Sequence, residues 1–246
     1  MKKIIIIMII LFMPIIVFGK EYSVEELNYK IDINDNDYMV FTRDNIENNQ
    51  ELSILNLTPE QMNTIMQNGN IYIDIIDRDL KYEIVMVVLN TGILDTKNFS
   101  NYSDEMLETA AKSYANTVGS EKYSVYKANH NYVVIDYYDS KTKYYIINYY
   151  TVVNGKGYNF QMQKTSAFTN GEKSSLKSMV DTINIKVLDE YKDETKDTYK
   201  TQTKKGIDWG SVKGSAIKGA IIGAVAGVIG AIAKLLTKKK NKKEEQ

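Results

Sequence analysis

The chain offers few residues whose spacing suits catalysis. Ser174 and Lys177 form a Ser-x-x-Lys pattern. On a helix this places a lysine one turn from a serine that it could deprotonate. In serine acyl-enzymes that use this pattern a Lys-Thr-Gly strand follows it, whereas Lys164-Thr165-Ser166 precedes it here. We therefore interpret the match as chance.

One segment imitates the start of a calcium-binding loop. Asp32, Asn34 and Asn36 have the right spacing, but the sixth position is Asp37 and the twelfth is Arg43. A calcium loop needs glycine at the sixth position and a bidentate glutamate at the twelfth. We interpret the segment as a turn between strands, with a weak calcium site as the alternative.

Other metal-ligand candidates do not converge. Asp74, Asp77 and Asp79 share one segment, but strand alternation puts Asp74 on the face opposite Asp77. The only histidine, His130, lies between two asparagines in a predicted turn, and we expect it to be exposed to solvent. The chain has no cysteine, which excludes disulfides, zinc ribbons and thiol nucleophiles. The sequence predicts no catalytic residue, metal or cofactor, and hence no enzyme.

Basic and acidic residues are unevenly distributed along the 246-residue chain. The total of 31 basic and 31 acidic residues is neutral, but residues 20–205 carry 21 basic against 28 acidic groups. Residues 206–246 carry 8 against 3. An acidic middle is repelled by phosphate backbones, so we expect no nucleic-acid partner.

The N-terminus reads as an export signal. Lys2 and Lys3 precede an apolar run, and Val17 and Gly19 supply small residues for cleavage after position 19. We predict a signal peptide over residues 1–19. An uncleaved anchor is the alternative, and it gives the same orientation across the membrane.

The C-terminus reads as a membrane anchor. Residues 216–236 carry only two charges, Lys218 and Lys234, one near each end. As a helix this run is roughly 31 Å long, which matches a bilayer core. Trp209 suits the outer interface, and a basic cluster follows the run at Lys238, Lys239 and Lys240. We predict a charged tether over 188–209, a transmembrane helix over 210–237 and a basic cytoplasmic tail over 238–246.

The predicted membrane helix carries a glycine zipper. Its small residues recur every four positions as Gly219, Gly223 and Gly227, interleaved with an alanine row at Ala216, Ala220 and Ala224. Small residues at this spacing let two helix backbones approach closely. We expect a homo-oligomer through this face. The alternative is a segment that lies on the membrane or inserts reversibly, because its glycine content lowers its hydrophobicity.

Between the two ends the pattern predicts one α+β domain over residues 20–187. Thr58 and Ser103 cap two helices, and a third runs from 171 to 183. Glycines at 155 and 157 suit a hairpin before the last long strand, whose Asn159, Gln161 and Gln163 we expect to face water. The predicted strands cover 27–33, 38–43, 71–77, 81–89, 123–127, 131–138, 143–153 and 158–164. Hairpin-length connections give an antiparallel sheet with helices packed on it.

The 19 tyrosines are the largest anomaly of composition. Tyrosine faces can stack on sugars or anchor a protein partner. Adjacent tyrosines of a strand point to opposite faces, however, so we interpret them as core and framework residues.

The domain resembles the PsbP-like family. The resemblance rests on the segment 149–160, which reads YYTVVNGKGYNF, on Phe168 and MVDTI at 179–183, and on NYSD at 101–104. The first two stretches are similar to the closing hairpin and the last helix end of PsbP-like domains. NYSD, which precedes the middle helix, is similar to the same point in secreted members from low-GC bacteria. The resemblance implies an α/β/α sandwich that acts as a non-catalytic binding or assembly module, and it carries no functional residue across.

Together these patterns predict a non-enzymatic extracellular binding or assembly module, anchored by a single pass in a bacterial cell membrane with its C-terminus in the cytoplasm. The predicted partners are the lipid bilayer, a second copy, and an extracellular protein or cell-wall ligand. Two alternatives stay open. One is a membrane-perturbing protein acting through the glycine zipper, and the other is a single-pass sensor or adaptor.

Overall fold

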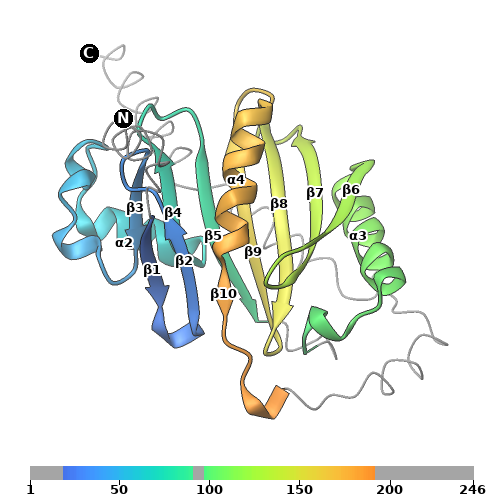
Figure 1. The fold of residues 1–246 in the computed structure, drawn as a ribbon. Coiled ribbons are helices and arrows are strands. Elements are labelled where there is room, and N and C mark those ends of the chain that lie inside the picture. Colours follow the sequence, from blue (N-terminus) through green and yellow to red (C-terminus); the bar gives the residue numbers. More distant parts are fainter. Residues whose placement is uncertain (1–18, 91–96, 192–246) are drawn as a thin grey trace, which may run out of the picture.

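The computed structural model describes residues 19–90 and 97–191, which form two antiparallel sheets (Figure 1). The smaller sheet has the order β1-β2-β10, with β1 (Lys20–Val24), β2 (Tyr29–Ile33) and β10 (Asn184–Ile185). The larger sheet has the order β3-β4-β5-β9-β8-β7-β6. Its strands are β3 (Tyr38–Thr42), β4 (Ile71–Asp77), β5 (Glu83–Asn90), β6 (Lys122–Lys127), β7 (Asn131–Asp139), β8 (Tyr144–Val153) and β9 (Lys156–Lys164).

Within the described residues, three helices pack on these sheets, namely α2 (Pro59–Asn68), α3 (Asp104–Val118) and α4 (Asn170–Thr182). The predicted caps are confirmed. The Thr58 side chain accepts a hydrogen bond from the Gln61 N–H in a capping box, and the Ser103 side chain accepts one from the Met106 N–H. Helix α3 ends at Gly119, whose φ of 71° favours glycine. Short 3₁₀ turns complete the description: η1 (Glu25–Leu27), η2 (Ile46–Asn48), η3 (Gln50–Ser53), η4 (Phe99–Asn101) and η5 (Asp189–Tyr191).

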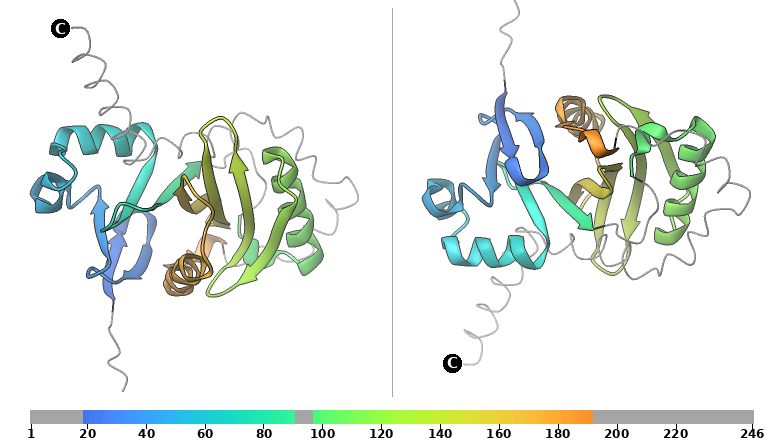
Figure 2. Two further views of the ribbon diagram at one scale, coloured as in Figure 1. Left: turned by 90° about the horizontal axis from the view of Figure 1, so that it is seen from above. Right: turned by 90° about the horizontal axis from the view of Figure 1, so that it is seen from below.

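Apolar side chains cover both faces of the larger sheet. On one face, α4 and the smaller sheet enclose a core that includes Met86, Phe160 and Leu176. On the other face, α2 packs over the β3-β4-β5 end, and α3 packs over the β6-β7-β8 end. Figure 2 shows α2 and α3 at opposite ends of this second face. The predicted α+β arrangement of helices on an antiparallel sheet is confirmed.

The predicted hairpins are also confirmed. Asn154 and Gly155 connect β8 to β9 with φ values of 52° and 70°, which is the backbone that a two-residue hairpin turn requires. Leu80, at φ 57°, ends the short turn between β4 and β5. Strand β5 pairs with β9 through contacts between distant parts of the chain, so β5, β9 and β8 lie side by side at the centre of the sheet.

Three sequence-based predictions need correction. Strand β1 was absent from the predicted elements, and it pairs with β2. The domain continues past 187, because the Leu188 N–H donates to Asn154 Oδ1 and Asn98 Nδ2 donates to the Tyr191 carbonyl. The polar face of β9 does not meet water, since Asn159, Gln161 and Gln163 are at most 1% exposed.

The predicted signal peptide (1–19, apart from its last residue), the rest of the tether, the transmembrane helix (210–237) and the tail (238–246) lie outside the described residues. The predicted zipper and interface residues therefore stay predictions. Within 19–90 and 97–191, no helix is both long and apolar enough to cross a bilayer.

Candidate functional site

The Ser-x-x-Lys pair does not form a catalytic dyad. Both residues lie on α4, and Lys177 Nζ donates to Asp181 Oδ2 at 3.0 Å while it sits 4.6 Å from the centre of the Tyr126 ring. Hydrogen bonds to Tyr126 and Asp181 raise the pKa of Lys177. A lysine held protonated in this way is a poor base for Ser174. The interpretation of the motif as chance agrees with this geometry.

The segment that imitates a calcium loop forms a turn. Asn34 Nδ2 donates to Asp37 Oδ2 at 2.7 Å, and the Asn36 N–H donates to Asn34 Oδ1 at 3.2 Å. Such side-chain contacts within four residues are typical of turns. In the described part of the chain, no group of three metal-ligating side chains is close enough together to hold an ion.

The expectation that His130 is exposed to solvent is wrong. Its Nε2 accepts a hydrogen bond of 2.9 Å from the Ile185 N–H, so the imidazole holds strand β10 in place. The ring also lies edge-on to Tyr132, with centroids 6.4 Å apart. Burial lowers the pKa of His130, which keeps Nε2 unprotonated and able to accept.

We expect the protein to lose stability as the pH falls from 7 to 5. Because the folded-state pKa of His130 lies below 6.5, the unfolded chain takes up the proton first, and stability is lost from the unfolded pKa downward. The loss is about 1 kcal/mol, the net value of one hydrogen bond. Urea unfolding at both pH values measures it. The control is His130→Gln, whose stability should not change over this range; equal pH dependence in the variant would contradict the assignment.

The domain contains a row of buried amides, which we call the amide strip: Asn148, Asn159, Gln161 and Gln163. The last three alternate along β9, so they share one face, and Asn148 of β8 lies opposite Gln161. Asn159 Nδ2 lies 3.5 Å from Gln161 Oε1, and Gln161 Nε2 donates to Gln163 Oε1 at 3.2 Å. The strip therefore runs along the centre of the face between α2 and α3.

Two buried carboxylates lie beside the strip. Glu83 of β5 pairs with Gln163 in register, and Gln163 Nε2 donates to Glu83 Oε2 at 2.6 Å. Asp74 of β4 points to the same face, two strands from Gln161. Both carboxylates have 0% exposure. Asp74 does not share a face with Asp77, as strand alternation predicts, and it is buried beside these amides, which strand alternation alone does not indicate.

Some acceptors of the strip are unsatisfied within the described structure. Asn148 Nδ2 donates to the Tyr114 hydroxyl at 2.9 Å, but Asn148 Oδ1 and Asn159 Oδ1 have no hydrogen-bond partner there. Burial raises the pKa of Tyr114, which stays a neutral phenol. An unpaired buried polar atom costs roughly 1–3 kcal/mol. Two such oxygens, 0–1% exposed, mark a place where hydrogen-bond donors would be favourable.

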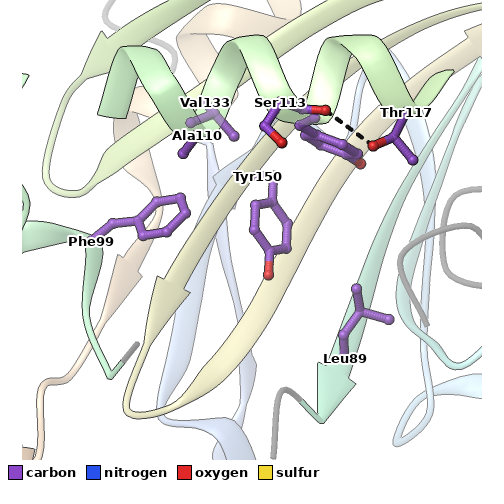
Figure 3. A pocket seen from close by; sticks show the side chains of 8 residues that line it. Leu89, Phe99, Ala110, Ser113, Thr117, Val133 and Tyr150 are labelled. Atoms are coloured by element: carbon purple, nitrogen blue, oxygen red, sulfur yellow. Dashed lines mark hydrogen bonds between the residues drawn. The ribbon is translucent and has the colours of Figure 1, made fainter. Parts of the chain in front are cut away.

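An apolar slot lies next to the strip, beneath α3 (Figure 3). The space in it that a water molecule can reach is about 20 Å³, room for about one water. Tyr150 joins the slot to the strip, because it lines the slot and pairs with Asn159 in register. The slot is lined by Leu89, Phe99, Ala110, Ser113, Tyr114, Thr117, Val133 and Tyr150.

This arrangement places hydrogen-bonding groups next to an apolar recess. The strip offers amide and carboxylate oxygens, and the slot offers an apolar recess. A nucleophile with a base and an orienting partner is not found there among the described residues. The sequence did carry a signal for the strip, the Asn-x-Gln-x-Gln alternation, but alternation alone does not reveal whether a polar face is covered.

The tyrosines serve the framework, as predicted. Tyr29 stacks on Tyr158 with centroids 6.2 Å apart, and Tyr132 meets Tyr149 edge-on at 6.1 Å. Of the described tyrosines, Tyr123 and Tyr138 stand out as exposed, at 41% and 48%. The interpretation as core residues is confirmed.

Of the comparisons with known proteins, the search of solved structures alone found similar proteins. No protein-family model matches the chain, and no curated protein matches it. It is similar to the solution structure of cyanobacterial PsbP (CyanoP) from Synechocystis, with 9% identity over 70% of this chain and 94% of that chain, at a TM-score of 0.41. A structure from Bacteroides thetaiotaomicron matches with 9% identity over 68% of this chain and 48% of that one, at 0.38. A PsbP protein is thus among its structural neighbours.

Proposed function

We propose that the protein is a non-enzymatic binding or assembly module, exported by its N-terminal signal and anchored in a bacterial cell membrane by residues 210–237. The α+β domain then lies outside the cell, and the basic tail lies in the cytoplasm. The amide strip with its adjoining slot carries the proposal. It combines amide oxygens that have no hydrogen-bond partner in the described structure with an adjoining apolar recess.

The chemistry of the strip restricts its partner. The amide oxygens of Asn148 and Asn159 that lack a hydrogen-bond partner in the described structure favour a partner that presents hydrogen-bond donors. The slot adds room for about one water molecule, far less than the roughly 300–1,000 Å³ that ligand pockets usually enclose, so it does not take a whole cofactor. An extracellular protein segment fits this combination, and a cell-wall ligand with amine groups is the other candidate.

Membrane anchoring has a direct test in Val225→Lys. Val225 lies near the middle of the apolar run, where a lysine costs about 2.5–3.5 kcal/mol on insertion scales. We expect this variant to move from the carbonate-resistant membrane fraction to the soluble or secreted fraction. The matched control is Val212→Lys, which adds the same charge beside Trp209 and should stay in the membrane. Equal retention of both variants would contradict a spanning helix.

The glycine content of the same segment favours a second candidate, in which residues 206–246 perturb membranes. A synthetic peptide of these residues should then release dye from vesicles of phosphatidylcholine and phosphatidylglycerol. A sensor or adaptor would instead use the zipper face to couple the domain to the tail, and Gly223→Leu would abolish that coupling.

A further inference from the structure

A second cavity, separate from the slot, opens beside β3, the end strand of the larger sheet (Figure 1). The space in it that water can reach is about 390 Å³, within the roughly 300–1,000 Å³ that ligand pockets usually enclose. Its walls come from β1, from the turns after β2 and β4, and from the segment between β3 and α2. We call it the polar pocket, after its lining side chains Tyr22, Asp35, Asn48, Gln50, Glu51 and Arg78.

Hydrogen bonds fix the wall between β3 and α2. The Val40 carbonyl accepts from Asn45 Nδ2 at 3.0 Å and from Asn49 Nδ2 at 3.1 Å. The Oδ1 atoms of these two amides accept in turn from the N–H groups of Thr42 and Glu51. Both amides are thus used to fold the wall. The cavity is therefore formed by the protein itself, and a ligand would bind without the cost of ordering this segment.

The charged side chains of the pocket are held as well. Arg78 Nη2 donates to the Asp35 carbonyl at 2.8 Å and to Glu51 Oε1 at 2.6 Å. The Tyr22 hydroxyl donates to Asp35 Oδ1 at 2.5 Å, and Lys20 Nζ lies 3.6 Å from Asp35 Oδ2. Burial and the bond to Asp35 raise the pKa of Tyr22, so its hydroxyl stays protonated. The two cations and two carboxylates of the pocket neutralise each other.

Other hydrogen-bonding groups of the pocket are available to a ligand. The exposed side-chain amides of Asn48 and Gln50 have no hydrogen-bond partner among the described residues. Glu51 Oε2 and Arg78 Nη1 have none there either. The pocket thus offers donors and acceptors together but no net charge.

This combination selects the chemistry of the ligand. A hydroxyl group is both a donor and an acceptor, so a ligand that carries several hydroxyls matches the available groups. A charged ligand group would instead have to displace a partner that Asp35 or Arg78 already has. Tyr22 supplies an aromatic surface on which the C–H groups of a sugar ring can pack.

We propose that the polar pocket binds a neutral saccharide. Sugar hydroxyls bond the amides of Asn48 and Gln50 together with Glu51 Oε2 and Arg78 Nη1, and a sugar ring packs against Tyr22. This inference goes beyond the proposed function, because it needs neither the amide strip nor the membrane anchor.

Binding of neutral oligosaccharides to the purified full chain tests this site. The chain is kept in a detergent that has no sugar headgroup. The probes are malto-, cello-, xylo-, manno- and chito-oligosaccharides on an array, followed by calorimetry in solution. We expect at least one series to bind. Asn48→Ala with Gln50→Ala should weaken that binding about tenfold or more, since it removes the hydrogen bonds of two amides.

The matched control is Gln67→Ala with Asn68→Ala, which removes the same two types of side chain from exposed positions of α2 outside the pocket. This control should bind as the unmodified chain does, and both double variants should keep its melting temperature. Failure of every saccharide series to bind, or equal weakening in the two double variants, would overturn the proposal. Glycylglycine, which has charged termini, is the competing probe. Binding of glycylglycine without any saccharide would overturn the proposal in favour of a zwitterionic ligand.

Discussion

Replacing Lys164 with methionine should lower the free energy of unfolding by about 3 kcal/mol, because it leaves a nearly buried carboxylate without its cation. Lys164 Nζ and Glu172 Oε1 are 2.6 Å apart, with side chains only 8% and 14% exposed. Desolvation raises the pKa of Glu172, but hydrogen bonds from Lys164 and from Thr169 outweigh it and hold that pKa below its usual value. The ion pair between Lys164 and Glu172 links helix α4 to the last residue of β9.

A double variant separates charge from packing at this pair. Lys164→Met keeps the aliphatic stem, and Glu172→Gln keeps an acceptor for the Thr169 N–H in the capping box. We expect Lys164→Met with Glu172→Gln to recover more than half of the stability lost by Lys164→Met alone, measured by urea unfolding. A loss below about 1 kcal/mol for the single variant would show that the pair behaves as a surface ion pair.

Phe99→Ala should lower the free energy of unfolding by about 3–5 kcal/mol, the usual cost of deleting a buried phenylalanine ring. Phe99 is 1% exposed. Its ring centroid lies 5.3 Å from that of Tyr102 and 5.7 Å from that of Tyr150, the second in an edge-on arrangement. Because Phe99 also lines the slot, the variant should enlarge this recess and admit a small apolar molecule such as benzene.

Thermal and urea unfolding measure this loss, and benzene should raise the melting temperature of the variant while leaving the unmodified protein unchanged. The matched control is Tyr138→Ala, which removes another aromatic ring at a site that is 48% exposed. Tyr138→Ala should lower the free energy of unfolding much less than Phe99→Ala does. Similar losses for the two variants would mean that Phe99 does not close the slot or support α3.

Local patterns in the sequence were sufficient to predict the helices, the hairpins and the antiparallel class of the sheet. Thr58 with Pro59 and Gln61 specifies a helix start through contacts within four residues, and the structure shows that capping box. Asn154 and Gly155 specify a hairpin through their own backbone preferences. Such features depend on neighbours in the chain, so a single sequence carries them.

Features set by distant contacts could not be predicted in this way. Strand β10 has two residues and owes its place to β2 and to the His130 side chain, 55 positions away. The burial of Gln161 and Gln163 depends on what covers β9, which strand alternation does not encode. The amide strip was therefore visible in the sequence as a pattern but not as a site.

The central claim is an exported domain anchored by the C-terminal segment, and protease treatment of intact cells tests it most directly. The full chain carries an epitope tag after Gln246, and the tag and the domain are followed separately. We expect the domain to be digested while the tag stays shielded in the membrane fraction. Release of the whole protein into the medium with its C-terminus intact would contradict it.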